Sequence, residues 1–154
     1  MKGNFNDGRQ TEQMCLLLLP AIATAIVVTT TLAIAAIFTA GYLFGTYWLS
    51  PDLDLKGAVR CRVWWRWKRA GLAWVWCAYP AIVGCHRSWL SHSIVIGTLL
   101  RIIYLCGIPT IAAIAIGINL SALLFPTAIA ILGIECAAIV HYARDGFEVR
   151  IPKR

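Results

Sequence analysis

The stretch QMCLLLLPAIATAIVVTTTLAIAAIFTAGYLFGTYWLSP, residues 13–51, contains no Asp, Glu, Lys or Arg in 39 positions. A second uncharged stretch covers residues 102–134, and only Arg101 interrupts the apolar sequence that leads into it. About 20 helical residues cross the hydrocarbon core of a bilayer, so each stretch is long enough for two short crossings. We therefore expect four membrane-spanning helices, at about 13–28, 32–49, 91–115 and 122–143.

The composition excludes an ordinary water-soluble domain. Of 154 residues, 60% are hydrophobic and 14% are charged, and the mean hydropathy is +0.73. Soluble domains contain roughly 45–50% apolar and about 25% charged residues, and disordered chains are poor in apolar residues. We expect an all-α fold, a multi-pass membrane helical bundle, in which residues 1–154 form a single membrane domain.

The two turns between paired helices are expected at residues 29–31, three threonines, and around residues 117–119, Gly-Ile-Asn. Threonine is tolerated inside membrane helices, and neither Gly nor Pro marks the first turn. A single long tilted helix over residues 13–51 is therefore the alternative to the first helix pair.

The basic residues predict the orientation of the helices. All of them except Arg101 precede the first helix, lie between the second and third, or follow the fourth, and the two opposite turns have none. Lys and Arg are enriched in cytoplasmic loops, so both termini and the middle segment are expected in the cytoplasm. The protein is then expected in an inner, plasma or thylakoid membrane.

Residues 55–90, between the second and third helices, predict a Trp/Arg-rich interfacial segment. Cations alternate with indoles in RCRVWWRWKR, residues 60–69. Indoles favour the headgroup level, where Lys and Arg reach phosphates, so the expected partner is a bilayer with anionic head groups. Such stretches also bind single-stranded nucleic acid, but the membrane flanks explain the composition, and no nucleic acid partner is expected. The expected interfacial tryptophans are Trp64, Trp65, Trp67, Trp74 and Trp76.

All three histidines and three of the four aspartates lie where helices meet one membrane face. PDLD (51–54) follows the second helix, HRSWLSH (86–92) leads into the third, and HYARD (141–145) ends the fourth. We expect these segments to converge at the cytoplasmic end of the bundle. The candidate metal ligands are Asp52, Asp54, His86, His92, His141 and Asp145.

The spacing of these residues suits a divalent cation. His141 and Asp145 are four residues apart on a helix and share a face. His86 and His92 are six residues apart and cannot share a helix face, so His86 is expected in the loop and His92 in the first helical turn. Imidazoles with carboxylates suit Zn, Mn or Fe, and six ligands are enough for two ions. Each motif alone also has a structural explanation, as a local hydrogen bond or a helix-ending turn.

Arg101 and Glu135 are the ionisable residues that lie deepest in the expected helices. Charged groups in hydrocarbon are costly and are usually paired. Arg101 lies nine residues after His92, and Glu135 lies six residues before His141. Their depths therefore match, and we expect an interhelical Arg101–Glu135 ion pair. The alternative makes Glu135 a support for the metal site or an extra ligand.

The order of these motifs resembles a known family. The chain has PDLD first, then HRSWLSHS before the apolar residues 94–100, and then HxxxD after Gly-Ile-Glu at 133–135. In this order of motifs it is similar to a family of small bacterial integral membrane proteins, common in cyanobacteria, that are described as uncharacterised metal-binding proteins. The resemblance covers residues 8 to 145. The chain is also similar, more distantly, to membrane-bound metal-dependent hydrolases. The resemblance implies a multi-pass helical protein that binds a divalent metal through the six ligands named above. Family members usually have a histidine where this chain has Thr11, and only the carboxylate of Glu12 follows their pattern.

Two functions from different classes fit this pattern. In the first, the metal has a structural role and holds the loop against the helix ends. The protein then stores metal or binds a membrane protein partner or a second copy of itself. The missing histidine at position 11 favours this function. In the second, a metal-dependent hydrolase, the metal activates water against a phospholipid-like or phosphoester substrate at the membrane surface. Glu12 is then the candidate base and Arg87 the candidate charge clamp. Transport is disfavoured, because a four-helix monomer lacks the paired broken helices of transporters.

Overall fold

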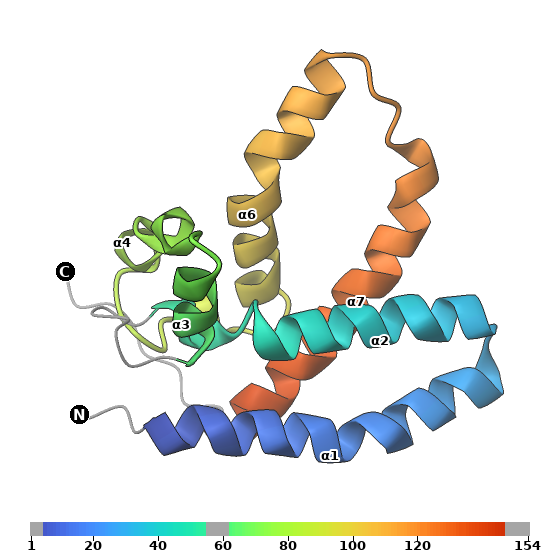
Figure 1. Cartoon of the computed structure of the whole chain (residues 1–154), viewed down its shortest axis with the longest axis horizontal. Helices are drawn as coiled ribbons and strands as arrows, with labels where there is room; N and C mark the ends of the chain where they lie inside the picture. Colours follow the sequence, from blue (N-terminus) through green and yellow to red (C-terminus); the bar gives the residue numbers. More distant parts are fainter. Residues whose placement is uncertain (1–4, 55–61, 147–154) are drawn as a thin grey trace.

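The computed structural model describes residues 5–54 and 62–146, and within these ranges the chain forms helices and no strand (Figure 1). The helices are α1 (Phe5–Thr29), α2 (Leu32–Tyr47), α3 (Arg62–Arg69), α4 (Tyr79–Val83), α5 (Trp89–His92), α6 (Ile96–Ala115) and α7 (Leu124–Arg144). Three short 3-10 turns join them, η1 (Pro51–Asp54), η3 (Ala73–Trp76) and η4 (Ser121–Leu123). The predicted all-α fold is confirmed.

Among the described residues, four segments are long and apolar enough to cross a membrane, namely Arg9–Thr29, Leu32–Asp54, Ile96–Ala115 and Ser121–Arg144. They coincide with the four crossings predicted from the uncharged stretches, although α1 begins before residue 13. Part of the expected interfacial segment, residues 55–61, lies outside the described residues. The same holds for the basic residues Lys2, Lys56, Arg60, Arg150, Lys153 and Arg154.

The three threonines separate α1 from α2. The hydroxyls of Thr29 and Thr30 each donate to the carbonyl oxygen four residues earlier, at 2.8 and 2.7 Å. Such bonds compete with the backbone hydrogen bonds of the last helical turn. The hydroxyl of Thr31 then accepts from the N–H of Ile34 at 3.4 Å and caps α2. Residues 13–51 therefore belong to two helices rather than one.

Helices α2 and α7 cross in close contact because small residues face each other. A Cβ atom on Gly41 would lie 2.1 Å from the carbonyl oxygen of Ala130, and one on Gly133 would lie 2.2 Å from that of Phe38. Gly41 and Gly45 are four residues apart on α2, a spacing that lets membrane helices approach closely. The crossing holds the C-terminal part of α2 against α7.

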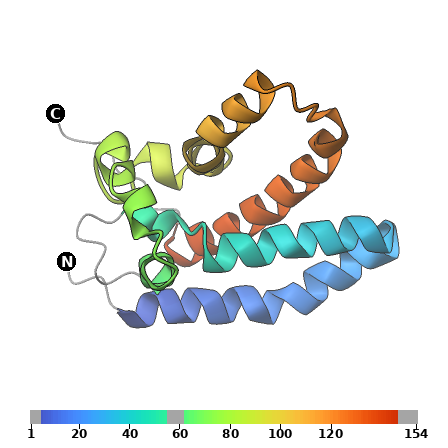
Figure 2. The ribbon, with the colours of Figure 1, turned by 45° about the horizontal axis from the view of Figure 1, so that its top comes forward.

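Helix α6 follows a different path. The helix expected at 91–115 is interrupted at residues 93–95, where Val95 has a φ of +68°. Beyond this break α6 runs away from α2, and the α6–α7 turn lies far from the α1–α2 turn in both views (Figure 1 and Figure 2). The two long helical hairpins therefore meet through the α2–α7 crossing, and α6 diverges from α2 toward the α6–α7 turn (Figure 1).

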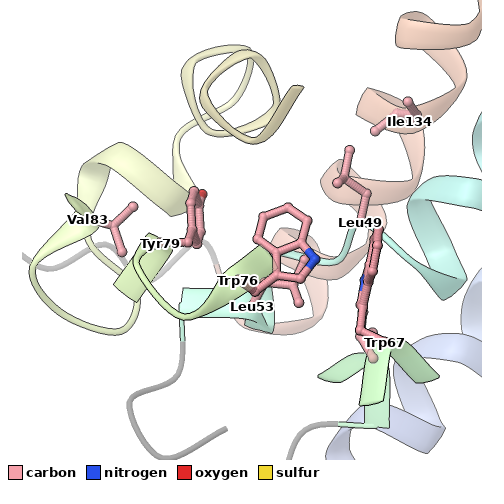
Figure 3. Close-up of a cluster of buried hydrophobic side chains, with 8 residues drawn as sticks. Leu49, Leu53, Trp67, Trp76, Tyr79, Val83 and Ile134 are labelled. Carbon is pink, nitrogen blue, oxygen red and sulfur yellow. The ribbon is translucent and has the colours of Figure 1, made fainter. Parts of the chain in front are cut away.

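An aromatic cluster fills the space between α3, α4 and the end of α2 (Figure 3). Trp67 and Trp76 are 6% and 2% exposed, and their ring centroids are 5.5 Å apart. The indole N–H of Trp67 donates to the carbonyl oxygen of Trp48 at 2.7 Å. Trp67 and Trp76, two of the tryptophans predicted at the membrane interface, thus pack into the protein interior, and Trp67 does so on the apolar side of the amphipathic α3. The other predicted interfacial tryptophans are at least partly exposed, namely Trp64, Trp65 and Trp74.

Candidate metal centre

Three segments that are far apart in the sequence meet at the shared end of the hairpins. The ring centroids of His86 and His92 are 5.5 Å apart, and those of His92 and His141 are 6.0 Å apart. All six residues expected as ligands lie in this cluster. Segment η1 contributes Asp52 and Asp54, α5 and the turn before it contribute His86 and His92, and the end of α7 contributes His141 and Asp145.

Asp54 is fully buried at the centre of one half of the cluster. Its carboxylate lies 2.7 Å from Nδ1 of His86 and 3.3 Å from Nδ1 of His92. It also accepts from the backbone N–H of Arg87 at 3.0 Å and from the hydroxyl of Ser91. Three hydrogen bonds therefore end on this carboxylate, and Nδ1 of His92, which faces it, also hydrogen-bonds with the hydroxyl of Ser91 at 3.0 Å. Since an ionised carboxylate only accepts, each facing Nδ1 carries a proton, and each Nε2 has a free lone pair.

The backbone of Arg87 is turned toward this carboxylate. Arg87 has a φ of +60°, a left-handed conformation that costs a non-glycine residue about 1 kcal/mol. Its backbone N–H reaches Asp54, and its guanidinium Nη2 lies 3.1 Å from Oδ2 of Asp145. Arg87, predicted as a charge clamp, therefore contacts two of the expected ligands.

His92 and His141 face the carboxylates of the other half of the cluster. Nε2 of His141 lies 3.4 Å from Asp52 and 3.5 Å from Asp145, and Nε2 of His92 lies 4.0 Å from the same oxygen of Asp145. Both Nε2 atoms are buried and make no hydrogen bond within the described part of the chain. Asp52, His92 and His141 offer ligand atoms that all lie within 4.8 Å of one another. Two imidazole nitrogens with two carboxylates are a donor set that fits a divalent cation.

For two members of the cluster that lie outside the four long apolar segments, His92 and Asp145, the environment favours the protonation state that binds a metal. Burial lowers the pKa of His92, although the hydrogen bond and charge of Asp54 oppose this shift. Burial alone would raise the pKa of Asp145, but the facing ring of His141 and the charge of Arg87 lower it. A neutral imidazole and an ionised carboxylate are the forms that bind a metal.

Arg101 and Glu135 do not form the predicted ion pair, because each contacts other groups. Arg101 donates to the carbonyl oxygen of Ser91 at 3.0 Å and to the hydroxyl of Tyr142 at 3.3 Å. Glu135 instead accepts from the N–H of Val95 at 2.9 Å. Arg101 therefore contacts α5 and α7 through neutral groups, and Glu135 contacts the residue that precedes α6. The N–H at the start of α6 lacks a helical partner and binds the carboxylate of Glu135.

A pocket beside the cluster is lined by Thr11, which occupies the position of the family's histidine, and by Glu12, the candidate base. Residues of α1, η1, α3 and α7 line it, among them Thr11, Glu12, Asp52, Arg62 and His141. The carboxylate of Glu12 lies 2.8 Å from Arg66 and 3.4 Å from Arg62. The hydroxyl of Thr11 accepts from the guanidinium of Arg144 at 2.5 Å. Glu12 and Thr11 therefore lie next to the cluster while making ion pairs and hydrogen bonds of their own.

Sequence reasoning missed two residues that contact the cluster. The hydroxyl of Ser91 donates to the carboxylate of Asp54. The hydroxyl of Tyr142 donates to the carbonyl oxygen of Ser91 at 3.1 Å. Their positions in the sequence could have indicated both residues, because Ser91 precedes His92 and Tyr142 follows His141.

Comparison with known proteins gives a family match and a relative. Residues 6–129 match the sequence model of the family described as "uncharacterized metal-binding protein (DUF2227)", a range that includes η1 and α5 and ends within α7. A protein of Aquifex aeolicus (strain VF5), called "Uncharacterized protein", is 37% identical over 68 residues. The alignment covers 44% of this chain and 43% of that protein, so the chain spans less than half of its relative's length. No solved structure matches the chain.

Proposed function

The chain belongs to the family described as uncharacterized metal-binding proteins, and we propose that it is a multi-pass membrane protein holding one divalent cation between His92, His141, Asp52 and Asp145. The observation that carries the proposal is the pair of buried Nε2 atoms on His92 and His141 that make no hydrogen bond in the described structure. Buried polar atoms are nearly always paired. A cation at this point would satisfy both nitrogens and neutralise the facing carboxylates.

In this proposal Asp54 and His86 do not bind the ion but support the residues that do. The carboxylate of Asp54 already accepts hydrogen bonds from His86, Arg87 and Ser91 and faces Nδ1 of His92, so most of its lone pairs are engaged. Its contact with Nδ1 of His92 sets the tautomer that leaves Nε2 available, as carboxylates commonly do behind metal-bound histidines. One ion rather than two is therefore proposed, although six candidate ligands are present.

The donor set narrows the identity of the ion. Two imidazoles with two carboxylates suit Zn, Mn or Fe, whereas Ca and Mg prefer all-oxygen sites and copper(I) prefers sulfur. When bound, such an ion acts as a Lewis acid and lowers the pKa of a coordinated water molecule.

The metal content of the protein in detergent micelles tests this proposal. We expect close to one zinc ion per wild-type chain and none in the His92→Ala/His141→Ala double variant. The matched control is His86→Ala, which removes a histidine of the same cluster and keeps the full metal content. Asp54→Asn weakens binding by about 10- to 100-fold without abolishing it. Wild type without metal, or a double variant that retains it, overturns the proposal.

We further propose that the cluster lies on the cytoplasmic side, next to anionic head groups. The positive-inside rule supports this orientation, and α3 contributes a cationic surface beside the cluster in which Lys68 lies 4.5 Å from the ring of Trp65. Reporter fusions to the C-terminus test the orientation. Activity of a reporter that works only outside the cytoplasm would contradict it.

A metal-dependent hydrolase is the second candidate, and the pocket favours it. Catalytic metal sites keep an open position, whereas structural sites are closed. The pocket is lined by two proposed ligands, Asp52 and His141, and by Glu12, which is the candidate base. Hydrolysis of a chromogenic phosphoester by the zinc-loaded protein, with a loss of about 100-fold in Glu12→Gln, would support it. Absence of hydrolysis in the wild type would remove this second candidate and leave the metal site intact.

A further inference from the structure

The carbonyl oxygen of Ser91 receives two buried donors from two different helices. Nη1 of Arg101 on α6 lies 3.0 Å away, and the hydroxyl of Tyr142 on α7 lies 3.1 Å away. Arg101 and Tyr142 are also linked to each other, at 3.3 Å. The turn that contains Ser91 is therefore fixed between α6 and α7 by a triangle of hydrogen bonds.

Gly97 makes this close approach possible. A Cβ atom at position 97 would lie 2.4 Å from the carbonyl oxygen of Ser91 and 3.0 Å from the hydroxyl of Tyr142. Real Cβ atoms do not come this close to a backbone oxygen. Any other residue at position 97 would push the Ser91 turn away from α6.

Burial of the Arg101 guanidinium at this position is energetically unfavourable. Its side chain is fully buried in a segment long and apolar enough to cross a membrane. The three groups to which it donates are neutral, namely the carbonyl oxygen of Ser91, the hydroxyl of Thr98 and the hydroxyl of Tyr142. Burying a charge costs several kcal/mol, and ionisable residues inside membranes usually mark a functional site.

The hydrogen-bonded triangle is adjacent to both histidines that face the proposed ion. His92 directly follows Ser91, and Tyr142 directly follows His141. The rings of His92 and Tyr142 have centroids 5.5 Å apart. A shift of the Ser91 carbonyl would therefore move the ring of His92 relative to that of His141.

We propose that Arg101 and Tyr142 are positioning residues for the metal centre, which hold Ser91 so that Nε2 of His92 faces Nε2 of His141. This inference rests on the proposed function, because it assumes that these two nitrogens bind the ion. Neither residue touches the ion itself. Their effect on metal binding passes through the Ser91–His92 peptide.

Zinc affinity, measured by competition with a fluorescent chelator in micelles, tests this inference. Tyr142→Phe removes one hydroxyl, and Gly97→Ala displaces the same carbonyl by steric contact. Each is expected to weaken zinc binding by about 10- to 100-fold, as for other residues that orient metal ligands. Each is also expected to shift the visible absorption of the cobalt(II)-loaded protein, which reports ligand geometry. The matched control is Thr98→Val, which removes a hydrogen bond of Arg101 but does not contact Ser91, and it keeps the wild-type affinity and spectrum.

The outcomes separate this inference from the proposed function. If metal-free Tyr142→Phe and Thr98→Val unfold at similar temperatures, and Tyr142→Phe and Gly97→Ala lose zinc affinity while Thr98→Val does not, the positioning role is supported. Wild-type affinity and spectrum in Tyr142→Phe, or an equal loss in Thr98→Val, overturn the positioning role alone. A wild type that binds no zinc overturns the proposed function, and the positioning role with it.

Discussion

Helix α7 contacts α2 and α6 in two different ways. Against α2 it packs backbone to backbone through Gly41 and Gly133. Against α6 it makes polar contacts near one end, where Tyr142 meets Arg101 and Glu135 meets the start of α6. Beyond those contacts α6 diverges, as Figure 2 shows.

The difference shows how a metal site is assembled from apolar helices. Close packing of small residues brings α2 and α7 together over a long distance, since membrane helices associate mainly through packing. The contacts of α5 and the start of α6 with α7 include hydrogen bonds, which act only where donors and acceptors meet. The metal centre lies where the two kinds of contact coincide, and the proposed ion would connect them.

The largest effect is expected from breaking the α2–α7 contact. Gly41→Ala places a Cβ atom 2.1 Å from the carbonyl oxygen of Ala130, so the helices must separate. The free energy of unfolding is expected to fall by about 3 kcal/mol, the upper part of the range for overpacked sites. Thermal unfolding in micelles, followed by circular dichroism, measures the loss.

Gly107→Ala is the matched control for that substitution. Gly107 lies on α6, and a Cβ atom there would meet nothing closer than 3.8 Å. The substitution is expected to leave stability unchanged or to raise it by up to about 1 kcal/mol, because alanine favours a helix. Equal destabilisation at positions 41 and 107 would show that the close crossing does not hold the fold together.

An intermediate effect is expected from removing the metal. An ion at 100 times its dissociation constant stabilises the folded state by about 2.7 kcal/mol. Because α5 and the start of α6 depend on polar contacts, a chelator should increase amide hydrogen exchange in residues 86–96 more than in α2. A uniform increase over both regions would contradict the distinction between them.

The smallest effect is expected from Glu135→Gln. The amide oxygen still accepts from the N–H of Val95, but the negative charge at the start of α6 is lost. Interaction of a charge with a helix N-terminus contributes about 0.3–1 kcal/mol. Thermal unfolding should therefore change far less than in Gly41→Ala, and an equally large loss would mean that Glu135 has a structural role beyond this contact.

Much of the site was predictable because its members are rare residues in an apolar chain. Only three histidines are present, and all three fall in segments that adjoin expected membrane crossings. Charge and hydropathy are properties of the residues themselves, so they locate the crossings and the face where the histidines gather. The pairing of Arg101 was not predictable in the same way, because depth along a helix does not give the direction of its side chain.

The amino-acid sequence by itself determined that the chain is helical, where its four long apolar segments lie, and which imidazoles and carboxylates gather at one end. These follow from local composition and from the length of helix that a bilayer requires. Only the tertiary structure decided that Asp54 accepts hydrogen bonds from His86, Arg87 and Ser91, while Nε2 of His92 and of His141 makes none in the described part of the chain. It also decided that Trp67 and Trp76 are core residues. Those outcomes depend on the break before α6, on the α2–α7 crossing and on side-chain directions, which only contacts between distant segments determine.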